Sequence, residues 1–336
     1  MLTIAWLLVV AVVATALVWR GSLYLEGAAD KLAAHYGLPA IVQGAVIAAV
    51  GSSFPELASV IIATVRYGEF ELGVAAIVGS AIFNILMIPA LSALAHRDVM
   101  ESTRAIVYRE AQFYIIAVAT LLLTFSLAVI YVPVSGAELV GTLTRPLALF
   151  PLALYGLYIF IQYLETREYQ PTVSSVSVNS IKQWGLLAIG LALILLGVEL
   201  LVHAAVEFGA FFETPSFLWG ITIIAAGTSL PDAIISVRAA RAGDSTVSLA
   251  NVFGSNIFDL LVAVPVGVLI AGSTAIDFAV AAPLMGFLVV ATIVLFATVR
   301  TDFALTDREA WLLLVLYALF VGWMVLESTG VTRIVL

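Results

Sequence analysis

Two short stretches of the chain set a carboxylate beside a proline and two hydroxyl side chains. The first stretch reads GSSFPEL (residues 51–57) and the second reads GTSLPDA (residues 227–233). Both lie inside long apolar segments, and a charged side chain at the centre of a membrane helix costs at least about 2.5–3.5 kcal/mol. Carboxylate and hydroxyl oxygens suit hard cations such as Ca²⁺ and Na⁺, and they suit zinc or copper poorly. The two stretches therefore predict cation binding.

A further motif follows each stretch and adds more oxygen atoms. GSAIFN occupies residues 79–84 and GSNIFD occupies residues 254–259. The acidic members of the four motifs have no basic residue near them in the sequence, so protonation, a distant partner or a bound cation must offset their charge. The candidate ligands are Ser52, Ser53, Glu56, Ser80 and Asn84 in the first half, and Thr228, Ser229, Asp232, Ser255 and Asp259 in the second half.

The proline in each stretch predicts a broken helix. Pro55 and Pro231 have no amide donor and disrupt a helix on their N-terminal side, and Gly51 and Gly227 ease unwinding there. Irregular backbone at membrane depth is tolerated only where it is buried in protein or lines a cavity. We therefore expect a break at each stretch, with its backbone turned towards the cation.

The expected breaks contribute to the site in two further ways. The carbonyl groups of Ala49 and Ala225, in the turn before each break, become free to act as ligands. Glu56 and Asp232 follow the prolines directly, near the N-terminus of the next half-helix, where the helix dipole favours an ionised carboxylate. Helix packing is an alternative explanation for each single serine and glycine, but it explains the acidic residues poorly.

Other polar residues in the apolar segments have no counterpart in the opposite half of the chain. We interpret them as packing or helix-interface residues. They are Glu26, Glu110, Glu199 and His203.

The composition identifies an integral membrane protein. Hydrophobic residues make up 63% of the chain and charged residues only 11%, whereas an average soluble domain has roughly 25% charged residues. The apolar N-terminal stretch has no basic region and no cleavage pattern, which predicts a retained first helix. The chain has no cysteine, which excludes disulfides, thiolate nucleophiles and iron–sulfur clusters. We expect no resident cofactor and no nucleic-acid partner.

Ten apolar segments are long enough to cross a bilayer core, which takes about 20 helical residues. We therefore expect an all-α fold in which a first five-helix unit (1–164) and a second five-helix unit (181–336) are joined by a short cytoplasmic linker (165–180). The expected spans lie near 2–33, 39–66, 71–96, 105–130, 145–164, 181–209, 215–241, 244–272, 277–299 and 307–328.

The two halves are related in sequence. A shift of 176 residues aligns Gly21 with Gly197 and Gly51 with Gly227, and a shift of 175 aligns GSAIFN with GSNIFD. Each half has an odd number of spans, so the second half must enter the membrane from the opposite face. This predicts inverted-topology repeats, an architecture typical of secondary transporters.

Basic residues near the span ends predict the orientation of the chain. With these spans, eleven Lys and Arg residues fall on one face and three, Arg66, Arg145 and Arg333, on the other. We therefore expect a multi-pass protein of the cell membrane with both termini outside the cell.

At this point the chain resembles the sodium/calcium exchangers of the cation/calcium antiporter superfamily, in a prokaryotic form with a short central loop. The blocks 44–90 and 220–265 are similar to the two alpha repeats of that family. The proton-coupled calcium exchangers typically carry a glycine–asparagine pair before the glutamate. This chain has Ser52–Ser53 and Thr228–Ser229 at the matching places, which favours sodium coupling.

The resemblance implies a mechanism and a ligand set. Glu56 and Asp232 would bind Ca²⁺ and also contact Na⁺, the hydroxyl side chains and the two alanine carbonyls would complete the coordination, and Asn84 and Asp259 would flank the site. The first and sixth spans would slide against the remaining helices to alternate access. Asp259 opposite Asn84 is a combination found in potassium-dependent members and in some potassium-independent ones, so potassium coupling remains an alternative.

The sequence therefore predicts an electrogenic Na⁺/Ca²⁺ antiporter rather than an enzyme. Its expected partners are the two ions and the lipid bilayer, with no obligate protein partner. A Ca²⁺/H⁺ antiporter on the same scaffold is the first alternative. An intramembrane aspartyl protease is a remote one, because Asp232 and Asp259 lie on successive spans, but the expected glycine-x-glycine-aspartate motif is absent.

Overall fold

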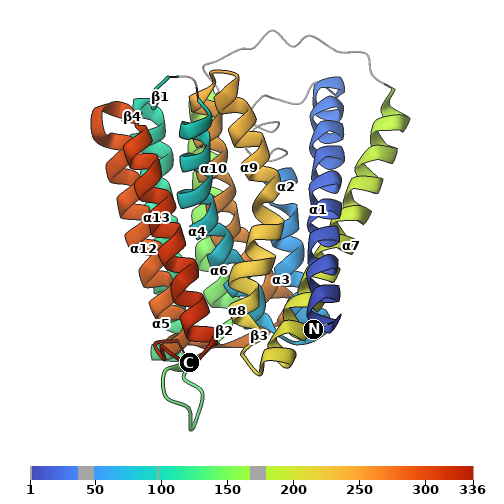
Figure 1. The fold of residues 1–336 in the computed structure, drawn as a ribbon, viewed down its shortest axis with the longest axis vertical. Coiled ribbons are helices and arrows are strands. Elements are labelled where there is room, and N and C mark those ends of the chain that lie inside the picture. The colour runs from blue at the N-terminus through green and yellow to red at the C-terminus, as the bar shows by residue number, and fades with distance from the viewer. Residues whose placement is uncertain (1, 37–48, 97, 167–178, 336) are drawn as a thin grey trace.

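The computed structural model describes residues 2–36, 49–96, 98–166 and 179–335, and these residues form a bundle of long helices (Figure 1). The first half contains α1 (Leu2–His35), α2 (Ala49–Ser52), α3 (Phe54–Tyr67), α4 (Phe70–Ala95), the π-helix η2 (Ile106–Ala111), α5 (Gln112–Tyr131) and α6 (Arg145–Thr166). The second half contains α7 (Ser180–Phe212), α8 (Phe217–Trp219), the π-helix η3 (Gly220–Ile224), α9 (Ala225–Arg241), α10 (Ser245–Phe258), the π-helix η4 (Asp259–Ala263), α11 (Val264–Ala271), α12 (Phe278–Arg300), the 3₁₀ turn η5 (Thr301–Phe303) and α13 (Asp307–Ser328).

Nine of the ten expected spans are confirmed as apolar helices long enough to cross a membrane, within the described part of the chain. The remaining span was expected over 39–66. Its described part consists of α2 and α3, and residues 39–48 lie outside the described residues. The protein is therefore a multi-pass membrane protein.

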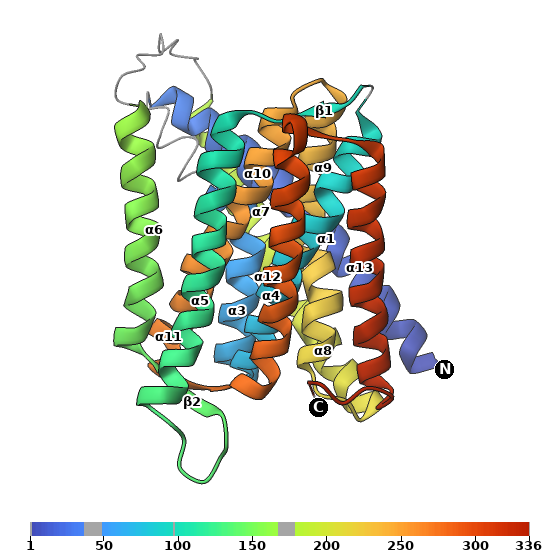
Figure 2. The same ribbon diagram turned by 90° about the vertical axis from the view of Figure 1, so that its left-hand side faces the viewer.

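The centre of the bundle is α4, which is buried along most of its length. Every residue from Leu72 to Leu86 is buried, in keeping with a helix that is apolar on all sides. Helices α12 and α13 cover one side of α4 (Figure 2), and α9 and α10 cover another. Polar side chains in this stretch of α4 are therefore shielded from lipid and bulk solvent.

Helices α1 and α7 form a separate pair at the edge of the bundle (Figure 1). Glycines at the contact allow their backbones to approach closely. A Cβ atom on Gly21 would lie 2.8 Å from the carbonyl oxygen of Gly190, and one on Gly197 would lie 2.8 Å from that of Ala14. Since Gly21 meets Gly190 while Ala14 meets Gly197, the two helices run antiparallel. They are the first helices of the two halves, so their packing confirms the inverted repeat.

Two short antiparallel ribbons lie outside the helices, and the expectation of a purely helical chain missed them. Strand β1 (Met100–Glu101) pairs with β4 (Ala304–Leu305), and β2 (Val140–Thr144) pairs with β3 (Ser273–Asp277). Pairing satisfies the backbone of segments that connect helices. We call the face that carries β2 and β3 the ribbon face, and the face where α6 ends and α7 begins the linker face (Figure 1).

Candidate functional site

The first predicted break is confirmed. Helix α2 ends at Ser52, Ser53 has a non-helical backbone (φ −93°, ψ 10°), and α3 begins at Phe54. Pro55 lies in the first turn of α3, where a missing amide hydrogen costs nothing, and Glu56 follows it in the same turn. The carboxylate therefore lies at the positive end of the helix dipole, as the sequence predicted.

The second predicted break is wrong in its position. Helix α9 runs from Ala225 to Arg241 without interruption and contains Pro231 in its interior. The irregular backbone lies further upstream, in the π-helix η3. The Thr228 hydroxyl donates a hydrogen bond to the Ala225 carbonyl (3.3 Å), one turn back in the same helix. Asp232 therefore lies well inside a continuous helix and not at a helix N-terminus.

The structure brings the ten predicted ligand side chains into the interior of the bundle. All ten are buried, with exposed fractions of 0–5%. The two halves meet directly there. The hydroxyl groups of Ser52 and Ser255 are 3.4 Å apart, and Ser80 shares a hydrogen bond with Ser229 and donates another to Glu56 Oε1 (3.4 Å). Residues that are 149 and 203 positions apart in the chain thus lie together in one polar cluster.

Two asparagines that were not among the predicted ligands, Asn251 and Asn256, also belong to this cluster. The Asn84 side chain donates to Asn256 Oδ1 (3.0 Å), and Asn256 donates in turn to the Ala81 carbonyl (3.1 Å). The Asn251 side chain donates to Ser236 Oγ (3.1 Å) and also interacts with the Asp232 carboxylate. Both asparagines lie on α10 among apolar residues, which is the signal that could have identified them.

Within the described part of the chain, several buried oxygen atoms of the cluster have no hydrogen-bond partner. A buried polar group without a partner costs free energy, so most such groups in folded proteins are satisfied. These six oxygens form an electronegative, all-oxygen environment of the kind that hard cations occupy. They are Glu56 Oε2, Asn84 Oδ1 and both carboxylate oxygens of Asp232 and of Asp259.

No basic side chain in the described residues offsets these carboxylates. The described ion pairs, Arg66–Glu199 and Arg109–Glu110, both lie elsewhere. Within the same residues, no three Asp, Glu or His side chains are close enough together to hold one metal ion. A cation here would therefore need hydroxyl, amide or carbonyl oxygens besides carboxylates. The roles of Ala49 and Ala225 as carbonyl ligands stay predictions.

The four residues interpreted as packing residues lie in different environments. Glu110 accepts hydrogen bonds from Tyr158 (2.8 Å) and Gln162 (3.0 Å), and Glu199 pairs with Arg66 (3.0 Å), so both join helices. His203 is exposed. Glu26 differs, because its Oε1 is buried without a partner and its carboxylate interacts electrostatically with Asp232.

One glycine of the motifs sets the distance between the two halves. A Cβ atom on Gly79 would lie 2.3 Å from the Ile221 carbonyl oxygen and 2.8 Å from the Ala225 Cβ. Gly254, at the equivalent place in the second half, has no described atom from outside its own helix turn within 4 Å of its Cβ position. Gly79 therefore permits the close approach of α4 to η3 and α9, whereas Gly254 has no such packing role.

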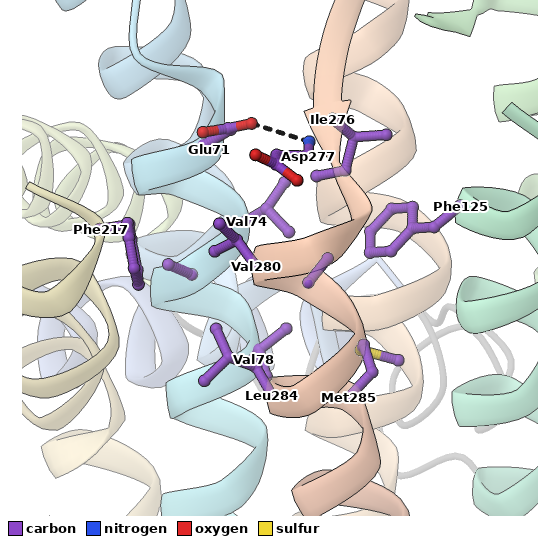
Figure 3. Close-up of a pocket in the computed structure, with 12 residues that line it drawn as sticks. Glu71, Val74, Val78, Phe125, Phe217, Ile276, Asp277, Val280, Leu284 and Met285 are labelled. Atoms are coloured by element: carbon purple, nitrogen blue, oxygen red, sulfur yellow. Dashed lines mark hydrogen bonds between the residues drawn. The ribbon is translucent and has the colours of Figure 1, made fainter. Parts of the chain in front are cut away.

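A separate cavity lies between α4 and α12, near the ribbon face (Figure 3). Its lining is mostly apolar and includes Phe125 and Phe217. Two acidic residues stand at its edge, where Glu71 Oε1 accepts a hydrogen bond from the Asp277 amide (2.9 Å). None of the predicted ligands lines this cavity, so it is distinct from the polar cluster.

Comparison with known proteins agrees with this geometry. The family model described as sodium/calcium exchanger protein matches residues 6–164 and 182–326. The putative antiporter CaxA of Alkalimonas amylolytica is 31% identical over 258 residues, which cover 76% of this chain and 77% of CaxA.

Two solved structures share the fold. The sodium-calcium exchanger NCX_Mj has a TM-score of 0.63 at 21% identity, with 95% of this chain and 98% of that chain covered. The H⁺/Ca²⁺ exchanger CAX has a TM-score of 0.72 at 18% identity, with 96% of this chain and 85% of that chain covered. From the family match over both halves, the chain belongs to the sodium/calcium exchanger family.

Proposed function

We propose that this protein exchanges Na⁺ for Ca²⁺ across the cell membrane by alternating access, and that the polar cluster is its ion site. The observation that carries the proposal is the group of six buried oxygen atoms without hydrogen-bond partners. Most buried polar groups in folded proteins have a partner, and a single cation can satisfy several of these oxygens at once. The proposed orientation has both termini outside the cell.

The proposed roles of the ligands follow from their charge and place. Glu56 and Asp232 supply the charged oxygens for Ca²⁺ from opposite halves of the protein. The hydroxyl groups are neutral oxygens suited to Na⁺, and Ser80 and Ser229 join the two halves by a hydrogen bond. Asn84 bonds to Asn256 in the same cluster, and Asp259 interacts electrostatically with Glu56 and Asp232.

Charge provides the physical reason for coupled exchange. With its three carboxylates ionised, the empty site carries a charge of −3 in a medium of low dielectric constant. Three Na⁺ would neutralise it and one Ca²⁺ would leave −1, so either load lowers the cost of burying the site. The empty site resists the conformational change, and this resistance suppresses uncoupled leak.

The direct test is ⁴⁵Ca²⁺ uptake into proteoliposomes that contain the purified protein. We expect rapid uptake into Na⁺-loaded vesicles and none above background into K⁺-loaded vesicles. Valinomycin with a set K⁺ gradient would establish electrogenicity, because a voltage should change the rate. Uptake driven by a pH gradient alone would instead identify a Ca²⁺/H⁺ antiporter, and uptake without any counter-ion would contradict antiport.

Removing the Ser80 hydroxyl should weaken ion binding without abolishing exchange. Ser80→Ala loses the contacts with Glu56 and Ser229, and a hydrogen bond to a charged group contributes about 1.5–3 kcal/mol. We expect the half-saturating Na⁺ or Ca²⁺ concentration to rise by about tenfold or more. Ser92→Ala is the matched control, because Ser92 is a buried serine of the same helix that pairs with Ser248 (3.1 Å) away from the cluster. Equal kinetics for both variants would remove Ser80 from the site.

A further inference from the structure

A line of polar residues follows one face of α1 towards the linker face. Thr15, Ser22, Glu26 and Asp30 are separated by seven, four and four residues. At about 100° per residue, Thr15, Ser22 and Glu26 deviate from one another by only about 20–40° around the helix. Asp30 continues the line one turn further on. The remainder of α1 is dominated by apolar residues, so this polar line needs a physical reason.

The line faces the ion site at two points. A Cβ atom on Gly227 would lie 2.9 Å from Thr15 Oγ1, and one on Gly51 would lie 3.5 Å from Glu26 Cγ. Gly51 and Gly227 begin the two motifs that carry Glu56 and Asp232. Because these glycines have no side chain, α1 lies directly against the backbone that precedes the two ligands.

Two members of the line have buried polar atoms without partners. Ser22 is only 1% exposed, and its hydroxyl has no hydrogen-bond partner. Glu26 Oε1 is also buried without a partner. The nearby Arg20 is directed to Tyr24 (3.2 Å) and forms no ion pair with Glu26. Unsatisfied oxygens therefore continue along α1 beyond the central cluster.

The charges along this line are all negative. The Glu26 carboxylate interacts repulsively with both Asp232 and Asp30. Exposure increases in the same order, because Asp232 is buried, Glu26 is partly buried and Asp30 is exposed. Because Glu26 repels the carboxylate on either side of it and accessibility increases outwards, a cation is attracted at each step.

The line leads to the linker face. The Trp184 indole at the start of α7 donates to the Tyr36 hydroxyl (3.3 Å), so the C-terminal end of α1 lies at that face. Glu26 is nine residues before the last residue of α1, a distance of about 14 Å along the helix axis. Glu26 thus occupies an intermediate depth between the central site and the linker face.

We propose that Glu26 is an intermediate cation-binding residue on the path between the central site and the linker face. The proposal rests on the proposed Na⁺/Ca²⁺ exchange and adds a residue from α1 to it. Glu26 would hold Ca²⁺ or Na⁺ briefly, with Asp30 as the outer carboxylate and the Ser22 hydroxyl as a neutral oxygen on the inner side.

The test is the sidedness of Ca²⁺ kinetics in Glu26→Gln. Right-side-out and inverted membrane vesicles would be compared, and their orientation assigned with an impermeant maleimide on Ile181→Cys. This label is specific because the chain has no cysteine and Ile181 is 85% exposed. We expect the half-saturating Ca²⁺ concentration to rise by about tenfold at the linker face and to stay within about twofold at the ribbon face, since one charge is lost on one side only.

Three further variants complete the experiment. Glu26→Asp keeps the carboxylate and should restore most of the wild-type affinity. Asp30→Asn should raise the half-saturating Ca²⁺ concentration at the linker face by a smaller factor of about two, because water screens the charge at this exposed position. Glu207 lies on the exposed side of α7, and Glu207→Gln should leave the half-saturating Ca²⁺ concentration unchanged at both faces.

The outcomes separate the two proposals. Equal changes at both faces in Glu26→Gln would indicate a structural effect, and no change at either face would exclude a role in ion passage; both results overturn the inference about Glu26. Absence of Na⁺-dependent Ca²⁺ flux in the wild-type vesicles would overturn the proposed exchange itself, and with it the role of Glu26.

Discussion

Glu56→Gln should abolish Na⁺-dependent Ca²⁺ uptake. The substitution keeps the size of the side chain and removes its charge, and Glu56 is 1% exposed with Oε2 free of any hydrogen-bond partner. A divalent ion in a medium of low dielectric constant depends strongly on each charged ligand, so we expect at least about a hundredfold loss of Ca²⁺ affinity.

An equilibrium measurement can separate lost binding from lost transport. A ligand that binds only the folded state of a protein stabilises that state by mass action and so raises the melting temperature. At a ligand concentration a hundred times the dissociation constant, the free energy of unfolding increases by about 2.7 kcal/mol. Ca²⁺ should therefore raise the melting temperature of the wild-type protein in detergent and leave that of Glu56→Gln unchanged. Near-normal flux together with a normal Ca²⁺-induced shift would remove Glu56 from the ligands.

Glu110→Gln is the matched control for this experiment. Glu110 is also a buried glutamate, with 4% of its surface exposed, but its oxygens accept hydrogen bonds from Arg109, Tyr158 and Gln162. The change should cost stability, because hydrogen bonds to a charged group contribute about 1.5–3 kcal/mol, while Ca²⁺ exchange by the folded fraction should persist. The contrast would show that loss of exchange depends on the place of the carboxylate and not on burial alone.

Gly79→Ala should disrupt exchange, whereas Gly254→Ala should be tolerated. The added Cβ at residue 79 would lie 2.3 Å from the Ile221 carbonyl oxygen, a backbone atom that can move only with η3. Overpacking of this kind costs about 1–3 kcal/mol. The shift would also separate Ser80 on α4 from Ser229 on α9, which now share a hydrogen bond.

The two glycines make a sharp comparison because they occupy equivalent positions in the repeated motifs. Among the described residues, no neighbour from beyond the local helix backbone lies within 4 Å of the Cβ position of Gly254, and alanine is favoured over glycine inside a helix. We expect Gly254→Ala to keep wild-type Ca²⁺ uptake and a wild-type melting temperature, and Gly79→Ala to lower both. Similar behaviour of the two variants would contradict the packing role assigned to Gly79.

The membrane helices and the candidate ligands of the polar cluster could be selected from the sequence because their signals are local. A bilayer requires long apolar segments, so the span boundaries over α4 (71–96 expected, Phe70–Ala95 observed) agree within a residue. A carboxylate in such a segment is costly enough to need a partner. For this reason Glu56, Asp232 and Asp259 could be selected without any knowledge of how the helices pack.

The differences between the two halves depended on tertiary packing, which the repeated motifs conceal. Pro55 and Pro231 occupy matching sequence positions, yet the helix breaks only before Pro55. Gly79 and Gly254 match as well, but only Gly79 lies against another backbone. The similar motifs reflect similar local sequence, but equivalent residues in the two halves pack against different neighbours and therefore differ in structure.

Glu26 gives the clearest case of contacts that sequence patterns could not predict. It stands in a long helix, outside the repeated motifs and without a counterpart in the second half, and so it resembled a packing residue. The structure places it against Gly51 and within electrostatic range of Asp232. Helix periodicity identifies the residues that share a face, but the partner that this face meets is set by contacts between segments far apart in the chain.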